Sequence, residues 1–147
     1  MVAASPRLRI AAECERRGRA AVVAGCVAAL QGGEPDSSLL LALGGPPARV
    51  MLSGDSRADV ALWSRVWGVR GLLWALDDAT ATSATDAVVA ALRDDAWRVR
   101  EKAAQVCARH LIDEAVEVLV VLRDNDPVAR VRLAAGRALR RLTVANA

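Results

Sequence analysis

The chain has 147 residues, a length that favours a single domain able to bury its apolar side chains without a disulfide or a metal ion. Apolar residues make up 54% of the chain although Phe and Tyr are absent, so Ala, Val and Leu must fill the interior, as is typical of closely packed helices. Basic residues outnumber acidic ones by 20 to 17, an excess too small to predict nucleic-acid or membrane binding by itself.

Few residues suit catalysis or metal binding. Cys14, Cys26 and Cys107 have no C-x-x-C spacing, and we expect them to be buried thiols in a reducing compartment. His110 is the single histidine, and its place at a helix end suits an interaction with the last carbonyl groups. No motif specifies a catalytic residue, a metal ion or a cofactor.

The chain also lacks the pattern of a membrane protein. Its longest apolar run, 20–30, is too short to cross a bilayer, and residues 1–9 contain no apolar core of a secretory signal. The expected location is therefore the cytoplasm, with no membrane partner.

Residues 1–58 contain short helical patterns separated by Gly and Pro. Ser5-Pro6 predicts a helix start, because Ser caps the first turn and Pro at the first helical position loses no hydrogen bond. This helix is expected to run to Arg17 and to break at Gly18. Further helices are expected over 20–30, 37–43 and 49–52, with turns at Gly32-Gly33, Glu34-Pro35-Asp36 and Gly44-Gly45-Pro46-Pro47.

From residue 59 onward the helical pattern is more regular. Asp59 is expected to cap a helix that ends near Leu76, with 80–83 as a linker. No stretch shows the alternation of a β-strand, which predicts an all-α fold. The later helices are expected over 86–92, 96–110, 113–122 and 127–144, with the short connections of antiparallel helix pairs.

Parts of this region repeat with a period of about 30 residues. The segment 94–100 aligns with 126–132, and Trp67-Gly68-Val69-Arg70 aligns with Trp97-Arg98-Val99-Arg100. A repeat of this length, made of two helices, indicates an α-solenoid in which each helix pair buries its apolar face against its neighbours.

The repeated residues resemble the HEAT family, and more closely the short HEAT-like repeats of phycobilisome lyases. That pattern has a Leu closing the first helix, an Asp-Pro turn, and Val-Arg followed by paired Ala on the second helix. It is matched by Leu122, Asp126-Pro127, Val131-Arg132 and Ala134-Ala135, and one repeat earlier by Leu92, Asp94, Val99-Arg100 and Ala103-Ala104.

The resemblance covers 59–147 and implies a right-handed α-solenoid of about four to five helix pairs. The whole chain, 1–147, would then be one domain with 1–58 as its degenerate N-terminal part. In each repeat an Asp precedes an Arg by six residues, and in HEAT repeats such residues form a ladder of hydrogen bonds between repeats. The resemblance implies that role for Asp94, Arg100, Asp126 and Arg132. Arg70 stands at the equivalent position of an earlier repeat, where Ser64 replaces the Asp.

A stripe of large side chains marks the helix expected after Asp59. Trp63, Trp67, Arg70 and Trp74 project within about 60° of one another at 100° per residue. Packing against the irregular segment 31–58 is one interpretation. The other is a protein-binding surface, because Trp with a flanking Arg is the composition of a binding hot spot.

Basic residues form a second candidate surface. The resemblance places the second helix of each pair on a concave face, where Arg98, Arg109, Arg130, Arg137 and Arg141 would form a ridge able to follow phosphate groups. A solvated face of a terminal helix is the alternative.

A third interpretation is enzymatic. Trp74 with Asp78, and Trp97-Arg98-Val99-Arg100, faintly resemble residues of the HEAT-like alkylpurine DNA glycosylases. The sequence favours a non-enzymatic scaffold that binds another protein, ahead of a nucleic-acid binder and ahead of this enzyme. It leaves open whether the protein is a monomer or a homodimer.

Overall fold

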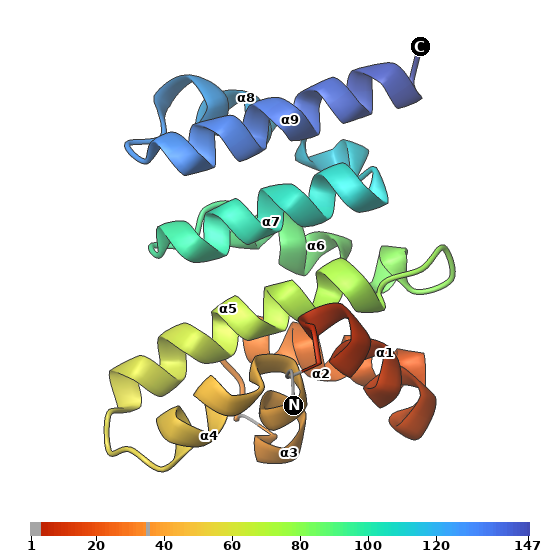
Figure 1. Cartoon of the computed structure of the whole chain (residues 1–147). Coiled ribbons are helices and arrows are strands. Elements are labelled where there is room, and N and C mark those ends of the chain that lie inside the picture. Colours follow the sequence, from red (N-terminus) through yellow and green to blue (C-terminus); the bar gives the residue numbers. More distant parts are fainter. Residues whose placement is uncertain (1–3, 35) are drawn as a thin grey trace. The chain divides into compact units, whose positions relative to one another are not determined.

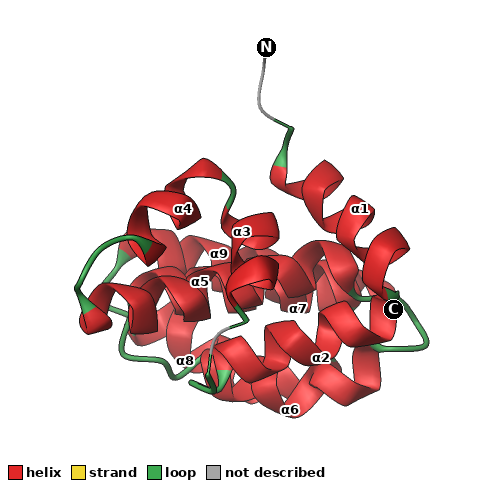
Figure 2. Ribbon diagram, turned by 90° about the horizontal axis from the view of Figure 1, so that it is seen from below, coloured by secondary structure: helices red, strands yellow, loops and turns green. Residues whose placement is uncertain are grey.

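The computed structural model describes residues 4–34 and 36–147, and these residues form helices joined by short loops (Figures 1 and 2). No strand occurs in this described part, so the all-α prediction is confirmed for it. The chain divides into two compact units, Met1–Leu76 and Asp77–Ala147. This division does not follow the change of sequence pattern at residue 59, because α5 (Arg57–Ala75) packs against α2 (Arg19–Leu30) within the first unit.

The first unit is built from five described helices. Ser5 caps the first of them by accepting a hydrogen bond from the Leu8 amide, and Gly18, with a φ of 89°, ends it, as the sequence indicates. The expected turn around Pro35 lies partly outside the described residues. The helices are α1 (Pro6–Arg17), α2, α3 (Ser37–Gly44), α4 (Pro46–Leu52) and α5.

Two helix starts in this unit differ from the sequence prediction. Ser56, and not Asp59, caps α5, because the Ser56 hydroxyl accepts a hydrogen bond from the Asp59 amide at 3.2 Å. The helix expected from Arg49 begins earlier, at Pro46, since two prolines fit the first turn of α4. Both differences lengthen the helices that surround the candidate site.

Glycines bring α5 and α2 into close contact. A Cβ atom on Gly68 would lie 2.8 Å from the carbonyl oxygen of Cys26, and a Cβ on Gly71 would collide with the Cys26 sulfur. Small residues at this crossing therefore allow the two helix backbones to approach each other closely. Cys26 is fully buried there, and its burial raises the pKa of the thiol to about 12.

The second unit contains α6 (Ala81–Ala91), α7 (Trp97–His110), a 3₁₀ turn η1 (Asp113–Ala115), α8 (Val116–Asn125) and α9 (Ala129–Ala145). Helix α9 packs against both α7 and α8, and Figure 1 shows α7 and α9 side by side. Small side chains on both helices are buried, namely Ala103 and Ala104 on α7 and Ala134 and Ala135 on α9.

The predicted linker at 80–83 is wrong. Thr80 and Asp77 exchange hydrogen bonds between backbone amides and side-chain oxygens, both at 3.0 Å, and this turn starts α6 at Ala81. The last helix begins two residues later than expected, at Ala129, because Val128 is extended and its amide donates to the Asp126 carboxylate. All three cysteines are buried and free, as predicted, and burial raises the pKa of Cys107 to about 12.

Gly68→Ala is expected to lower the free energy of unfolding by about 2 kcal/mol, because the new methyl group must push the α2 backbone away from α5. Gly136→Ala in α9 is the control, since its Cβ would meet Arg140 at an ordinary 3.6 Å. Higher helix propensity is expected to raise stability there by about 1 kcal/mol. Urea denaturation measures both variants, and equal effects would contradict the close crossing of α2 and α5.

Candidate functional site

Three residues of the Trp–Arg stripe line one pocket of the first unit. Trp63, Trp67 and Arg70 lie on the same face of α5, and the two indole rings are tilted against each other with centroids 5.8 Å apart. The pocket has a volume of about 570 Å³, within the range of small-ligand sites. Its apolar wall on the opposite side comes from the end of α3 and from α4, namely Gly44, Pro47, Val50 and Met51. We call it the α4–α5 pocket.

The absence of a side chain at Gly44 makes room for one of the indoles. A Cβ on Gly44 would lie 2.8 Å from ring atoms of Trp67 and 2.7 Å from the Cβ of Ala48. Trp67 is only 4% exposed, whereas Trp63 is half-buried and leaves part of its ring at the pocket. Trp67 therefore belongs to the core, and Trp63 offers the accessible aromatic surface.

One end of the α4–α5 pocket is acidic. Asp55, Ser56 and Asp59, from the loop before α5 and its first turn, line the pocket and are exposed. A helix rises about 1.5 Å per residue, so Asp59 and Arg70 stand roughly 16 Å apart along α5 with the two Trp between them. The pocket thus has carboxylates at one end and a guanidinium at the other.

The guanidinium of Arg70 has no carboxylate partner among the described residues. Its Nη2 donates to the carbonyl oxygen of Leu43 at 2.6 Å, and its Nε is buried without a hydrogen-bond partner. Burial lowers the pKa of Arg70, and the positive charge of Arg9 lowers it further. Arg9 itself donates to the carbonyl oxygens of Ala42 and Leu43, at 3.1 and 3.4 Å. Two cations therefore converge on the end of α3, where only carbonyl oxygens receive them.

Trp74, the fourth residue of the stripe, does not line this pocket. The guanidinium of Arg7, on α1, lies 5.6 Å from the centroid of its ring, a cation–π distance. The structure thus brings together three of the four predicted residues and places Trp74 against α1.

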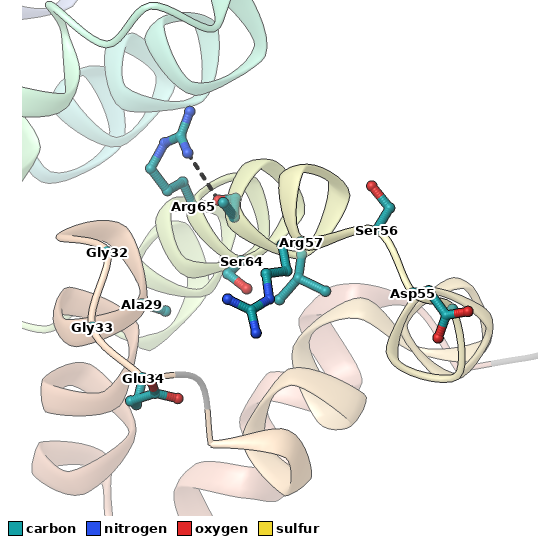
Figure 3. Close-up of a pocket in the computed structure, with 12 residues that line it drawn as sticks. Ala29, Gly32, Gly33, Glu34, Asp55, Ser56, Arg57, Ser64 and Arg65 are labelled. Carbon is teal, nitrogen blue, oxygen red and sulfur yellow. Dashed lines mark hydrogen bonds between the residues drawn. The ribbon is translucent and has the colours of Figure 1, made fainter.

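A second, smaller pocket of about 300 Å³ lies between the end of α2 and the start of α5 (Figure 3). The hydroxyl of Ser64 is buried there without a hydrogen-bond partner. Figure 3 shows Gly32, Gly33 and Glu34 on one side of this pocket. Its lining carries charged groups of both signs, Glu34 and Asp55 as well as Arg57 and Arg65, so it selects no ligand charge.

Hydrogen bonds join the four residues to which the HEAT resemblance assigns a ladder. Arg100 donates two hydrogen bonds to the carboxylate of Asp126, from Nε at 2.8 Å and from Nη2 at 3.2 Å. Its Nη1 donates to the carbonyl oxygens of Asp94 and Asp95. Arg132 donates to the carbonyl oxygen of Asp126 at 2.6 Å. All three guanidinium nitrogens of Arg100 are engaged in these hydrogen bonds. The glycosylase interpretation would need this guanidinium to be available to a substrate.

The residues of the basic ridge are all exposed on α7 and α9, but they differ in their contacts. Arg130 pairs with the buried carboxylate of Glu101 at 3.1 Å, and the guanidiniums of Arg98 and Arg130 lie 4.5 and 5.4 Å from the ring centroid of Trp97. Arg137 and Arg141 form no ion pair with the described residues. Arg109, the remaining member, lies in the last turn of α7.

The sequence indicated the Trp–Arg face of this site but not its opposite wall. Asp59 shares the helical spacing of Trp63, Trp67 and Arg70, and that spacing could have identified it as part of the site instead of as a cap. Arg9 carries no such signal, because only folding brings α1 to the end of α3.

Comparisons with protein-family models, with curated proteins and with solved structures found no match for this chain. Within 4–34 and 36–147, no cluster of three His, Cys, Asp or Glu side chains is arranged to hold a metal ion. None of the helices formed by these residues is both long enough and apolar enough to span a bilayer.

Asp126→Asn is expected to destabilise the protein by about 3 kcal/mol at neutral pH, because it leaves the Arg100 guanidinium without its countercharge. Burial alone would raise the pKa of Asp126, but hydrogen bonds from Arg100 and from the Val128 amide hold it below the usual value. The carboxylate therefore stabilises the fold above about pH 4, and this stabilisation is lost as the pH falls further.

Urea unfolding at pH 7 and at pH 3 measures both effects. Asp124→Asn is the control, since the Asp124–Arg123 pair is exposed and its loss should have little effect. The variant at Asp126 should lose less stability on acidification than the wild type. An unchanged pH dependence would show that this carboxylate does not carry the acid sensitivity.

Proposed function

We propose that the protein is a non-enzymatic scaffold that binds another protein through the α4–α5 pocket, with helix pairs arranged as a HEAT-like right-handed α-solenoid. One observation supports the binding role above the others. Arg70 stands beside two Trp at a pocket, and its buried Nε has no partner within the described residues.

The composition of the pocket is that of a protein-binding hot spot. Trp and Arg contribute most to binding where apolar contacts exclude water around them. Val50, at the edge of the pocket, is 73% exposed, and Met51 next to it lines the wall. A partner would therefore cover apolar surface on α4 as it fills the pocket.

The HEAT-like arrangement is supported by the hydrogen bonds of the second unit. Arg100, on the second helix of one pair, binds the turn that opens the second helix of the next pair. Asp94 and Asp126 each accept a hydrogen bond from the amide two residues later, at 2.8 and 2.9 Å. Equivalent residues thus make equivalent contacts in successive repeats.

Trp63→Ala is expected to reduce capture of the partner at least tenfold, because a hot-spot Trp contributes about 2 kcal/mol or more to binding. Trp74→Ala, on the same helix but outside the pocket, is the control. Quantitative affinity capture from a native lysate, with circular dichroism of each variant, measures the effect. Capture of the same proteins in the same amounts by folded Trp63→Ala would refute the proposal.

Nucleic-acid binding is the second candidate, and α9 supports it. Arg137, Arg140 and Arg141 are exposed there, and no acidic residue follows Asp126 in the sequence. Because Arg130 is already paired with Glu101, the surface available to phosphates is shorter than the full predicted ridge.

If α9 binds phosphates, Arg137→Ala/Arg141→Ala should weaken binding to a DNA or RNA duplex and reduce the slope of log K against log salt by roughly 2, one for each lost contact. Arg123→Ala, which removes an arginine already paired with Asp124, is the control. Fluorescence anisotropy at several salt concentrations measures both. No binding at low ionic strength would eliminate this candidate.

A further inference from the structure

The charge pattern of the α4–α5 pocket indicates the chemistry of its occupant, an inference that rests on the proposed protein-binding role. At its basic end, Arg70 and the nearby Arg9 are held by carbonyl oxygens of α3, and no carboxylate of the described residues pairs with either. Arg70 keeps a buried donor, Nε, without an acceptor. A guanidinium with unused donors binds a carboxylate through two parallel hydrogen bonds, as Arg100 does with Asp126.

Next to this cationic end the walls are apolar. The ring of Trp67 and the half-buried ring of Trp63 follow Arg70 along α5 toward Asp59, and Met51 also lines the pocket. An anionic group that reaches Arg70 must therefore be attached to an apolar body. These apolar walls disfavour a strongly hydrated phosphate at this end of the pocket.

The acidic end of the pocket favours a positively charged group. Asp55 and Asp59 are exposed at its rim, with no basic side chain lining that end. A separation of roughly 16 Å from Arg70 corresponds to about four to five residues of extended chain. An occupant that matches both ends is a peptide with a carboxylate at one end, an apolar side chain beside it, and a basic residue about four positions before.

We propose that the α4–α5 pocket binds the carboxy-terminus of a partner protein, with the terminal carboxylate on Arg70, the last side chain against the apolar wall between Arg70 and Trp63, and an upstream Lys or Arg at Asp55 and Asp59. The two ends of the pocket then fix both the polarity and the register of the bound segment. An internal Asp or Glu is a poorer match, because the chain continuing beyond it would have to pass the apolar wall.

The test uses the full chain and four synthetic peptides, acetyl-Lys-Ala-Ala-Ala-X, in which X is Leu, Met, Phe or Trp with a free carboxylate. Two-dimensional NMR of the ¹⁵N-labelled protein follows the indole N–H groups of Trp63 and Trp67 and the Nε–H of Arg70. At least one peptide should shift all three resonances. Its carboxamide should bind about tenfold or more weakly, because it loses a charge-assisted pair of hydrogen bonds.

Two variants and a matched control locate the binding. Arg70→Gln should abolish the preference for acid over amide, whereas Arg65→Gln, on the same helix but outside this pocket, should keep it. Asp59→Lys should weaken the Lys-bearing peptides and strengthen versions with Glu in place of Lys. Because Asp59 is exposed, this variant is expected to fold even if Arg70→Gln does not.

Three outcomes would overturn the inference. The first is that none of the four peptides shifts the Arg70 resonance. The second is that a peptide acid and its carboxamide bind with equal affinity. The third is that 4-methylpentanoate binds as tightly as the Leu peptide, which would assign the site to a small acid. If capture of the partner still depends on Trp63 in any of these cases, the proposed protein-binding role stands without the carboxy-terminus. If capture does not depend on Trp63, that role itself fails.

Discussion

A guanidinium that the fold partly buries constrains both units, because it cannot lose its proton and must be given acceptors wherever it is covered. In the second unit the carboxylate of Asp126 and two backbone carbonyl oxygens satisfy Arg100. In the first unit Arg70 holds the equivalent sequence position, but it has one carbonyl acceptor and a second cation nearby. The same residue type is therefore saturated in one unit and short of acceptors in the other.

This difference follows from one change in the sequence. Asp94 and Asp126 precede their helices, where a carboxylate can accept a backbone amide and face an arginine of the repeat. Ser64 stands at the same distance before Arg70, but it lies inside α5, which begins at Arg57. Its short hydroxyl is buried in another pocket without a partner. Within α5, Ser64 offers no carboxylate to Arg70, whose guanidinium lines the α4–α5 pocket.

Sequence reasoning predicted most of what is local in this structure. The Ser5 cap, the break at Gly18 and the all-α character follow from capping chemistry and from the 3.6-residue periodicity, which act over a few neighbouring residues. The start of α6 was missed because Asp77 and Thr80 form a capping turn through reciprocal hydrogen bonds that composition does not reveal. The Trp–Arg face of the pocket was predictable from its spacing on one helix. Its other wall, on α4, and the approach of Arg9 depend on tertiary packing, for which the sequence carried no signal.

The contact between Gly44 and Trp67 has a mechanical consequence. With less than 3 Å between an added Cβ and the indole, the corner where α3 meets α4 rests directly on the ring. The ring of Trp67 is therefore fixed by the same corner that carries the carbonyl of Leu43, the acceptor shared by Arg9 and Arg70. The position of the indole and the positions of both guanidiniums thus depend on one turn of the backbone.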